Sequence, residues 1–142
     1  MKPFDRNLFE KYDVAARKAT TAFIEGQGWK VREHPDIYAH DLLATKDGIT
    51  LLVECEVKAV WESGDFPYET VHLPERKRKF FDPNAVFFIW RKDMKDAAYF
   101  WARDVDDVET VEVPNKYMKS NERFFSIPID LVKFVSDAPV QG

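Results

Sequence analysis

The stretch DLLATKDGITLLVECEVK, residues 41–58, predicts a β-hairpin that decides the fold of the chain. Asp47 and Gly48 form the Asp-Gly pair that favours a two-residue turn between antiparallel strands. Runs of mostly apolar residues flank this pair, the second of them rich in Val, Leu and Ile, and they predict strands over residues 41–45 and 49–60. The rest of the chain is therefore expected to be arranged around this hairpin.

The predicted turn also sets which side chains meet across the hairpin. With Asp47 and Gly48 as the loop, Asp41 lies opposite Glu54 and diagonal to Glu56, with Cβ atoms about 5 Å and 7 Å apart. Lys58 follows on the same face, because alternate residues of a strand share a face. A slip of one residue would turn Asp41 to the other face. The opposite face is apolar and is expected to face the core through Leu51, Val53, Cys55, Val57 and Ala59.

Three carboxylates and one ammonium on one patch are typical of a site for phosphodiester hydrolysis. Like charges placed opposite each other destabilise a hairpin, and a divalent cation removes that repulsion. Mg²⁺ is held by one or two carboxylates, waters and substrate phosphate, and a neighbouring lysine can orient the attacking water. The alternative is that Glu54, Glu56 and Lys58 are the polar residues of an ordinary half-solvated strand.

Asp41, followed fifteen residues later by Glu56-Val57-Lys58, resembles the signature of the PD-(D/E)xK nuclease superfamily, whose fold is also called restriction-endonuclease-like or Holliday junction resolvase-like. The resemblance implies an α/β fold, with a central mixed β-sheet flanked by helices in an αβββαβ core. It also implies that Asp41 and Glu56 bind Mg²⁺ or Mn²⁺ and that Lys58 assists the nucleophilic water. His40 stands where many members of the superfamily have proline.

The same resemblance implies a further acidic ligand on the first helix. Glu10 and Glu25 are the two choices here, and Glu10 is preferred. Glu54 is either an additional metal ligand or a polar neighbour, because Glu56 is the acid that precedes the lysine by two residues.

The elements around the hairpin follow from periodicity and from breaking residues. Apolar residues at three- and four-residue steps predict a helix over 5–25, capped by Asp5 and ended by Gly26. Pro74 is expected to open a short helix over 75–81. Further strands are expected at 29–31, 85–90, 97–103, 111–113 and 124–127, and all strands are expected to belong to a single sheet. A last helical turn is expected at 131–135.

Residues Arg76, Lys77 and Lys79 belong to the one dense basic run of the chain. On the short predicted helix they are expected to bind the phosphate backbone without reading sequence, with help from the helix N-terminus. The alternative is a solvated face whose charges pair with Glu75 and Asp82.

Composition limits the remaining classes. The 142 residues predict one domain over 1–142, with a frayed tail at 136–142. One cysteine excludes an intrachain disulfide, no apolar run approaches the roughly 18 residues of a membrane helix, and no secretory signal is visible, so a cytoplasmic protein is expected. The net charge of -4 argues against coating of a polyanion by overall charge.

Together these features predict a metal-dependent endonuclease acting on nucleic acid, with DNA the expected substrate and a homodimer the expected assembly. The alternative is a catalytically inactive module that binds nucleic acid or protein on the same fold.

Overall fold

Two β-sheets organise the protein, which is described here by a computed structural model covering residues 6–114 and 122–135. The larger sheet has the strand order β1-β2-β3-β5-β6-β9, and the smaller has the order β4-β8-β7. The strands are β1 (Lys30–Glu33), β2 (Leu42–Lys46), β3 (Ile49–Lys58), β4 (Thr70–Pro74), β5 (Ala85–Arg91), β6 (Ala97–Trp101), β7 (Thr110–Val113), β8 (Glu122–Pro128) and β9 (Lys133–Phe134). The helices are α1 (Arg6–Gly26) and α2 (Ala102–Val105), with the 3-10 helices η1 (Glu75–Phe80) and η2 (Ile129–Leu131).

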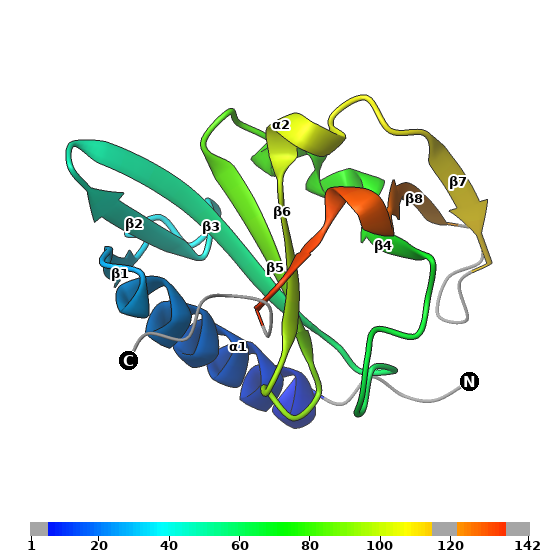
Figure 1. Ribbon diagram of the computed structural model, residues 1–142, viewed down its shortest axis with the longest axis horizontal. Coiled ribbons are helices and arrows are strands. Elements are labelled where there is room, and N and C mark those ends of the chain that lie inside the picture. The colour runs from blue at the N-terminus through cyan, green and yellow to red at the C-terminus, as the bar shows by residue number, and fades with distance from the viewer. Residues whose placement is uncertain (1–5, 115–121, 136–142) are drawn as a thin grey trace.

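Helix α1 covers one face of the larger sheet, on the side of β1, β2 and β3 (Figure 1). Its apolar stripe buries Ala16 and Ile24 against strand residues that include Val53 and Phe88. The helix was expected over 5–25 and is confirmed. Its predicted cap, Asp5, and the predicted frayed tail at 136–142 lie outside the described residues.

The hairpin has the predicted register. Leu42 pairs with Val53 and Lys46 pairs with Ile49, so the turn consists of Asp47 and Gly48. Both turn residues have positive φ, 51° and 80°, which matches the right-handed twist of the flanking strands.

Strand β3 joins the hairpin to the rest of the sheet through a parallel pairing with β5, and β5 pairs antiparallel with β6. The sheet is therefore mixed, and β5 is buried along nearly its whole length because both of its faces are covered. This α/β architecture, a large mixed sheet with helices, confirms the predicted fold class.

The second face of the larger sheet differs from the expectation. It is covered by the small sheet and η1, with a core that contains Phe87, Ile89, Leu73 and Phe125 (Figure 1). The strands expected at 111–113 and 124–127 thus form a separate sheet with β4, since β4 contributes alternating buried residues that need a partner layer. The carboxylate-bearing face of β3 is consequently a buried face rather than an open one.

The C-terminal end of the described chain was predicted wrongly. Residues 131–135 were expected to form a helical turn, whereas β9 pairs there with β6 through Ala98–Phe134 and Tyr99–Lys133. The open edge of β6 supplies the hydrogen bonds that override the local helical preference. Across the described residues, no helix is both long and apolar enough to cross a membrane.

Candidate active site

Asp41 lies at the start of the hairpin, where it is held against β3. The backbone N–H of Cys55 donates a hydrogen bond of 3.0 Å to its Oδ2 atom, and its own carbonyl accepts a bond of 3.2 Å from the N–H of His34. The side chain is partly buried. The paired residues of the hairpin begin at Leu42 and Val53, so Asp41 lies just outside the ladder, and its Oδ2 atom is also 3.8 Å from Sγ of Cys55.

Glu54, Glu56 and Lys58 form a row along one face of β3. Glu54 is 6 % exposed, and the other two side chains are partly buried. In the parallel partner strand, Phe87 and Ile89 lie beside Glu54 and Glu56, so apolar groups surround the carboxylates. The structure thus places charged groups where water is scarce, which gives each charge more influence on its neighbours.

Lys77 reaches this row from η1. Its Nζ atom donates a hydrogen bond of 3.3 Å to Oε2 of Glu54. Side-chain exposures of 19 % for Lys77 and 8 % for Glu54 make this a nearly buried ion pair. The sequence predicted that Lys77 binds the phosphate backbone of nucleic acid. It did not predict the contact with Glu54, because 23 residues separate Lys77 from Glu54.

Burial raises the pKa of all three carboxylates. The pKa of Glu54 rises to about 7, because burial and the charge of Asp41 outweigh the opposing effect of Lys77. Burial also raises the pKa of Asp41, against the hydrogen bond from Cys55. For Glu56, burial raises the pKa while Lys77, Lys58 and Arg76 act in the opposite direction. Burial is the largest cause at all three positions, and it favours the protonated form of each carboxyl group.

The donor chemistry of this cluster fits a hard divalent cation. Asp41, Glu54 and Glu56 offer only oxygen donors, which Mg²⁺ and Mn²⁺ prefer. Within residues 6–114 and 122–135, no three His, Cys, Asp or Glu side chains lie close enough together to form a complete metal-binding group. Cation binding here would thus depend on one or two carboxylates, with waters and substrate completing the shell.

On α1 the carboxylate that influences the site is Asp13. Its charge contributes to raising the pKa of Asp41, whereas Glu10, the residue preferred from the sequence, is exposed, as is Glu25. Asp13 also forms an ion pair with Arg17, one turn further along the helix. Helical spacing could have pointed to Asp13 in the sequence, because Asp13 stands three residues before Ala16, which is buried.

The basic run on η1 divides its side chains among different partners. Arg76 lies 3.5 Å from Glu122, and the guanidinium of Arg78 stacks 4.7 Å from the ring centre of Phe125. Lys79 lies over the ring of Phe80 at 5.0 Å. The element is a 3-10 helix of six residues, too short to offer the dipole that the sequence argument attributed to its N-terminus.

His40 connects η1 to the hairpin. Its Nε2 atom lies 2.6 Å from the carbonyl oxygen of Phe80, and the two rings pack edge to face at 5.1 Å. This contact ties Phe80, the last residue of η1, to the residue that precedes Asp41. On the other side of the row, burial lowers the pKa of His72. The nearby charge of Lys58 lowers that pKa further.

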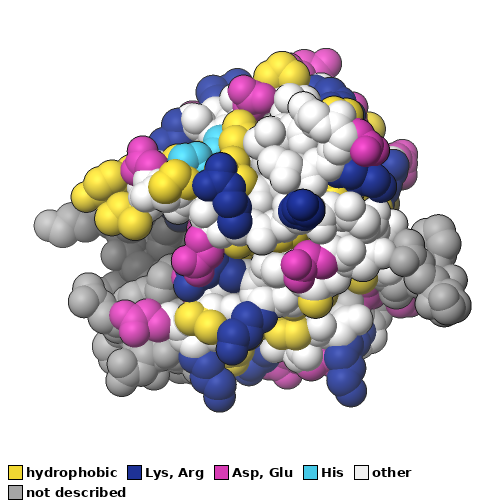
Figure 2. Space-filling model, turned by 90° about the vertical axis from the view of Figure 1, so that its left-hand side faces the viewer, with side chains coloured by type: hydrophobic (Ala, Val, Ile, Leu, Met, Phe, Trp, Pro, Cys, Tyr) yellow, Lys and Arg dark blue, Asp and Glu magenta, His cyan; other side chains and the backbone are white. Residues whose placement is uncertain are grey.

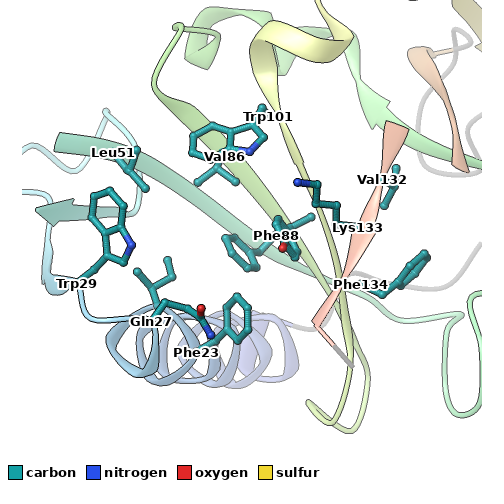
Figure 3. A pocket seen from close by; sticks show the side chains of 12 residues that line it. Phe23, Gln27, Trp29, Leu51, Val86, Phe88, Trp101, Val132, Lys133 and Phe134 are labelled. Carbon is teal, nitrogen blue, oxygen red and sulfur yellow. The ribbon is translucent and has the colours of Figure 1, made fainter. Parts of the chain in front are cut away.

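A pocket of about 250 Å³ opens beside Asp41 and is also lined by Arg17, His34 and His40. A larger apolar pocket of about 480 Å³ lies on the α1 face of the sheet, away from the carboxylate row (Figure 3). Its walls include Phe23, Trp29, Phe88 and Trp101.

Comparison with known proteins supports the fold through structure alone. No protein-family profile matches the chain, and no curated protein matches it. Among solved structures, a bacterial homing endonuclease, I-Ssp6803I, is similar, with a TM-score of 0.50 and 14 % sequence identity. The similarity covers 77 % of this chain and 78 % of that one. This chain therefore shares a fold with a homing endonuclease over most of its length.

Proposed function

We propose that this protein is a metal-dependent nuclease that hydrolyses phosphodiester bonds of DNA. The observation that supports the proposal is the position of Asp41, whose Oδ2 atom accepts a hydrogen bond from the N–H of Cys55, the residue between Glu54 and Glu56 on β3. The fold shared with a homing endonuclease is consistent with this chemistry. A homodimer is the assembly expected for cutting both strands of a duplex.

In this proposal Asp41 and Glu56 would hold Mg²⁺ or Mn²⁺, and Glu54, which is paired with Lys77, would lie beside them without completing a three-carboxylate group. The bound ion supplies a stabilising charge for the phosphoryl oxygens and lowers the pKa of a bound water. Lys58 orients the attacking water, because its ammonium stands at the end of the carboxylate row. Lys77 holds Glu54 in place through their ion pair.

The basic side chains of η1 provide contacts to the phosphate backbone. Arg76, whose side chain is 68 % exposed, and Lys79 have access to solvent next to the carboxylate row. Such contacts add affinity that does not depend on base sequence.

Binding without cleavage is the second candidate function. The Lys77–Glu54 ion pair favours it, since an ammonium that already neutralises Glu54 reduces the need for a cation. In that case the protein would bind nucleic acid through η1, and affinity would fall steeply with salt.

A cleavage assay separates these two functions. Plasmid, linear and branched DNA are incubated with the protein in Mg²⁺, in Mn²⁺ or with a chelator. Lys58→Ala and Glu56→Gln are expected to lower the metal-dependent rate by about 100-fold or more. Lys30→Ala is the matched control, because Lys30 is exposed and pairs with Thr45 at the opposite end of β1 from Asp41.

Identical, metal-independent background from wild type and Lys58→Ala would reject the nuclease. If salt-sensitive binding persisted in that case and was lost on changing residues 76–79 to alanine, the second candidate would stand instead.

A further inference from the structure

An unusual turn lies between β1 and β2, beside the candidate active site. The backbone N–H of Ala39 donates a 3.1 Å hydrogen bond to the carbonyl of Asp36, so Ile37 and Tyr38 are the central residues of a tight turn. Ile37 is 85 % exposed and Tyr38 is 83 % exposed. Turn centres favour Gly, Pro, Asn, Asp and Ser, so two large apolar side chains here need a reason outside the fold.

Local hydrogen bonds hold this turn in place. The N–H of Tyr38 donates to Oδ1 of Asp36 at 2.9 Å, and the N–H of Asp36 donates to Nδ1 of His34 at 3.0 Å. The N–H of His34 in turn bonds to the carbonyl of Asp41, at the base of the loop. Ile37 and Tyr38 are therefore presented by a fixed backbone, which lowers the entropic cost of using them as contacts.

The turn borders the same pocket as Asp41. Ile37 and Asp41 both line the pocket of about 250 Å³, together with Arg17. On this side of the molecule hydrophobic side chains project from the surface next to histidine (Figure 2). A group held against the turn would therefore lie on the same pocket as the carboxylate of Asp41.

We propose that Ile37 and Tyr38 contact a nucleobase of the substrate, which rests on the proposed nuclease function. A tyrosine ring stacks on any base, and an aliphatic side chain can wedge between base steps. Such contacts favour DNA with unstacked bases beside the scissile phosphate, as in a bulge, a mismatch or a branch. Within a matched duplex the same contacts first require unstacking, which opposes binding.

Binding of 2-aminopurine duplexes tests this proposal without relying on cleavage. The fluorescent base is placed in a bulge or in a matched duplex, and each is titrated with protein carrying Lys58→Ala in Mg²⁺. Stacking is expected to quench the bulged probe. Tyr38→Ala is expected to raise the Kd for that probe by about 10-fold and to abolish the quenching.

Two controls isolate the role of the ring. Tyr38→Phe keeps the ring and is expected to bind like the parent. Ile49→Ala removes a side chain that is 51 % exposed at the other end of the hairpin, and it too is expected to bind like the parent. Ile37→Ala is expected to reduce the preference for the bulge. Equal binding of both probes by Tyr38→Ala, Ile37→Ala and the parent would overturn the proposal.

The two proposals fail in different ways. Cleavage by wild type without Tyr38-dependent quenching would reject only the base contact, and quenching without cleavage by wild type would reject only the nuclease. A dimer seen in sedimentation that Ile37→Ala dissociates, with DNA binding unchanged, would assign the turn to self-association and overturn the base contact.

Discussion

Glu54 is the residue whose environment deviates most from that of an ordinary strand position. It is nearly buried, lies close enough to Asp41 for that charge to raise its pKa, and has Lys77 as its ion-pair partner. Burial of a carboxylate disfavours its charged form, and the nearby carboxylate does the same. The alternation of charged and apolar residues revealed that Glu54 and Glu56 share a face, but it could not reveal that this face is covered.

Stability should therefore fall as pH rises through the range in which Glu54 ionises. Between its usual pKa of 4.5 and the folded value of about 7, the folded protein binds more protons than the unfolded chain. The contribution of Glu54 is fully present below pH 4.5 and is lost as pH passes about 7, on the order of 3 kcal/mol in total. Glu54→Gln is expected to flatten this slope in urea unfolding from pH 5 to pH 8.

The slope should not disappear, because burial also raises the pKa of Asp41 and Glu56. Glu112→Gln, at an exposed position of β7, is the control and should leave the slope unchanged. If Glu54→Gln and wild type lose stability equally over this range, Glu54 does not carry the effect.

Among the elements, α1 and β5 are joined by a buried polar contact. The indole N–H of Trp90 donates to Oγ1 of Thr20 at 2.7 Å, and that hydroxyl donates to the carbonyl of Ala16 at 2.7 Å. Thr20 is fully buried. The apolar stripe of the helix predicted its buried face, whereas the partner of Thr20 lies 70 residues away and had no local signal.

Removing this contact should loosen α1 from the sheet. Thr20→Val keeps the shape of the side chain but leaves the Trp90 N–H without its acceptor, which is expected to cost about 1–3 kcal/mol. Urea unfolding monitored by tryptophan fluorescence measures the loss. Thr20→Ser retains the acceptor and should cost less, and Thr21→Val, at the partly exposed neighbouring position, should cost little. Equal losses for Thr20→Val and Thr20→Ser would show that packing, not the hydrogen bond, holds the helix.

At the scale of the whole molecule, the small sheet acts as the second layer over the carboxylate face. Phe125 is fully buried at its centre, stacked on Phe81 at 5.1 Å and lying against the guanidinium of Arg78. Because η1 packs against β4 and β8 of the small sheet, this layer also positions Lys77 beside Glu54.

Phe125→Ala should weaken both the fold and the site. The cavity is expected to cost about 3–5 kcal/mol in urea unfolding. Water admitted to the second core should also bring the pKa of Glu54 closer to 4.5, which would reduce the pH slope described above. Tyr68→Ala, at a side chain that is 49 % exposed, is the control and should change neither quantity strongly. An unchanged pH slope in Phe125→Ala would show that the small sheet does not set the environment of Glu54.

The sequence by itself determined the helix over α1, the Asp47–Gly48 turn and the register that pairs Leu42 with Val53. These features depend on periodicity and turn chemistry within a short span, so they can be read locally. The row of Glu54, Glu56 and Lys58 follows from the same alternation.

Only the tertiary structure decided that a second sheet covers this row, that Lys77 pairs with Glu54 and that Asp13, not Glu10, influences Asp41. These contacts join residues far apart in the chain. Their formation depends on how whole layers pack, because burial and charge partners are set by neighbours that no local pattern specifies.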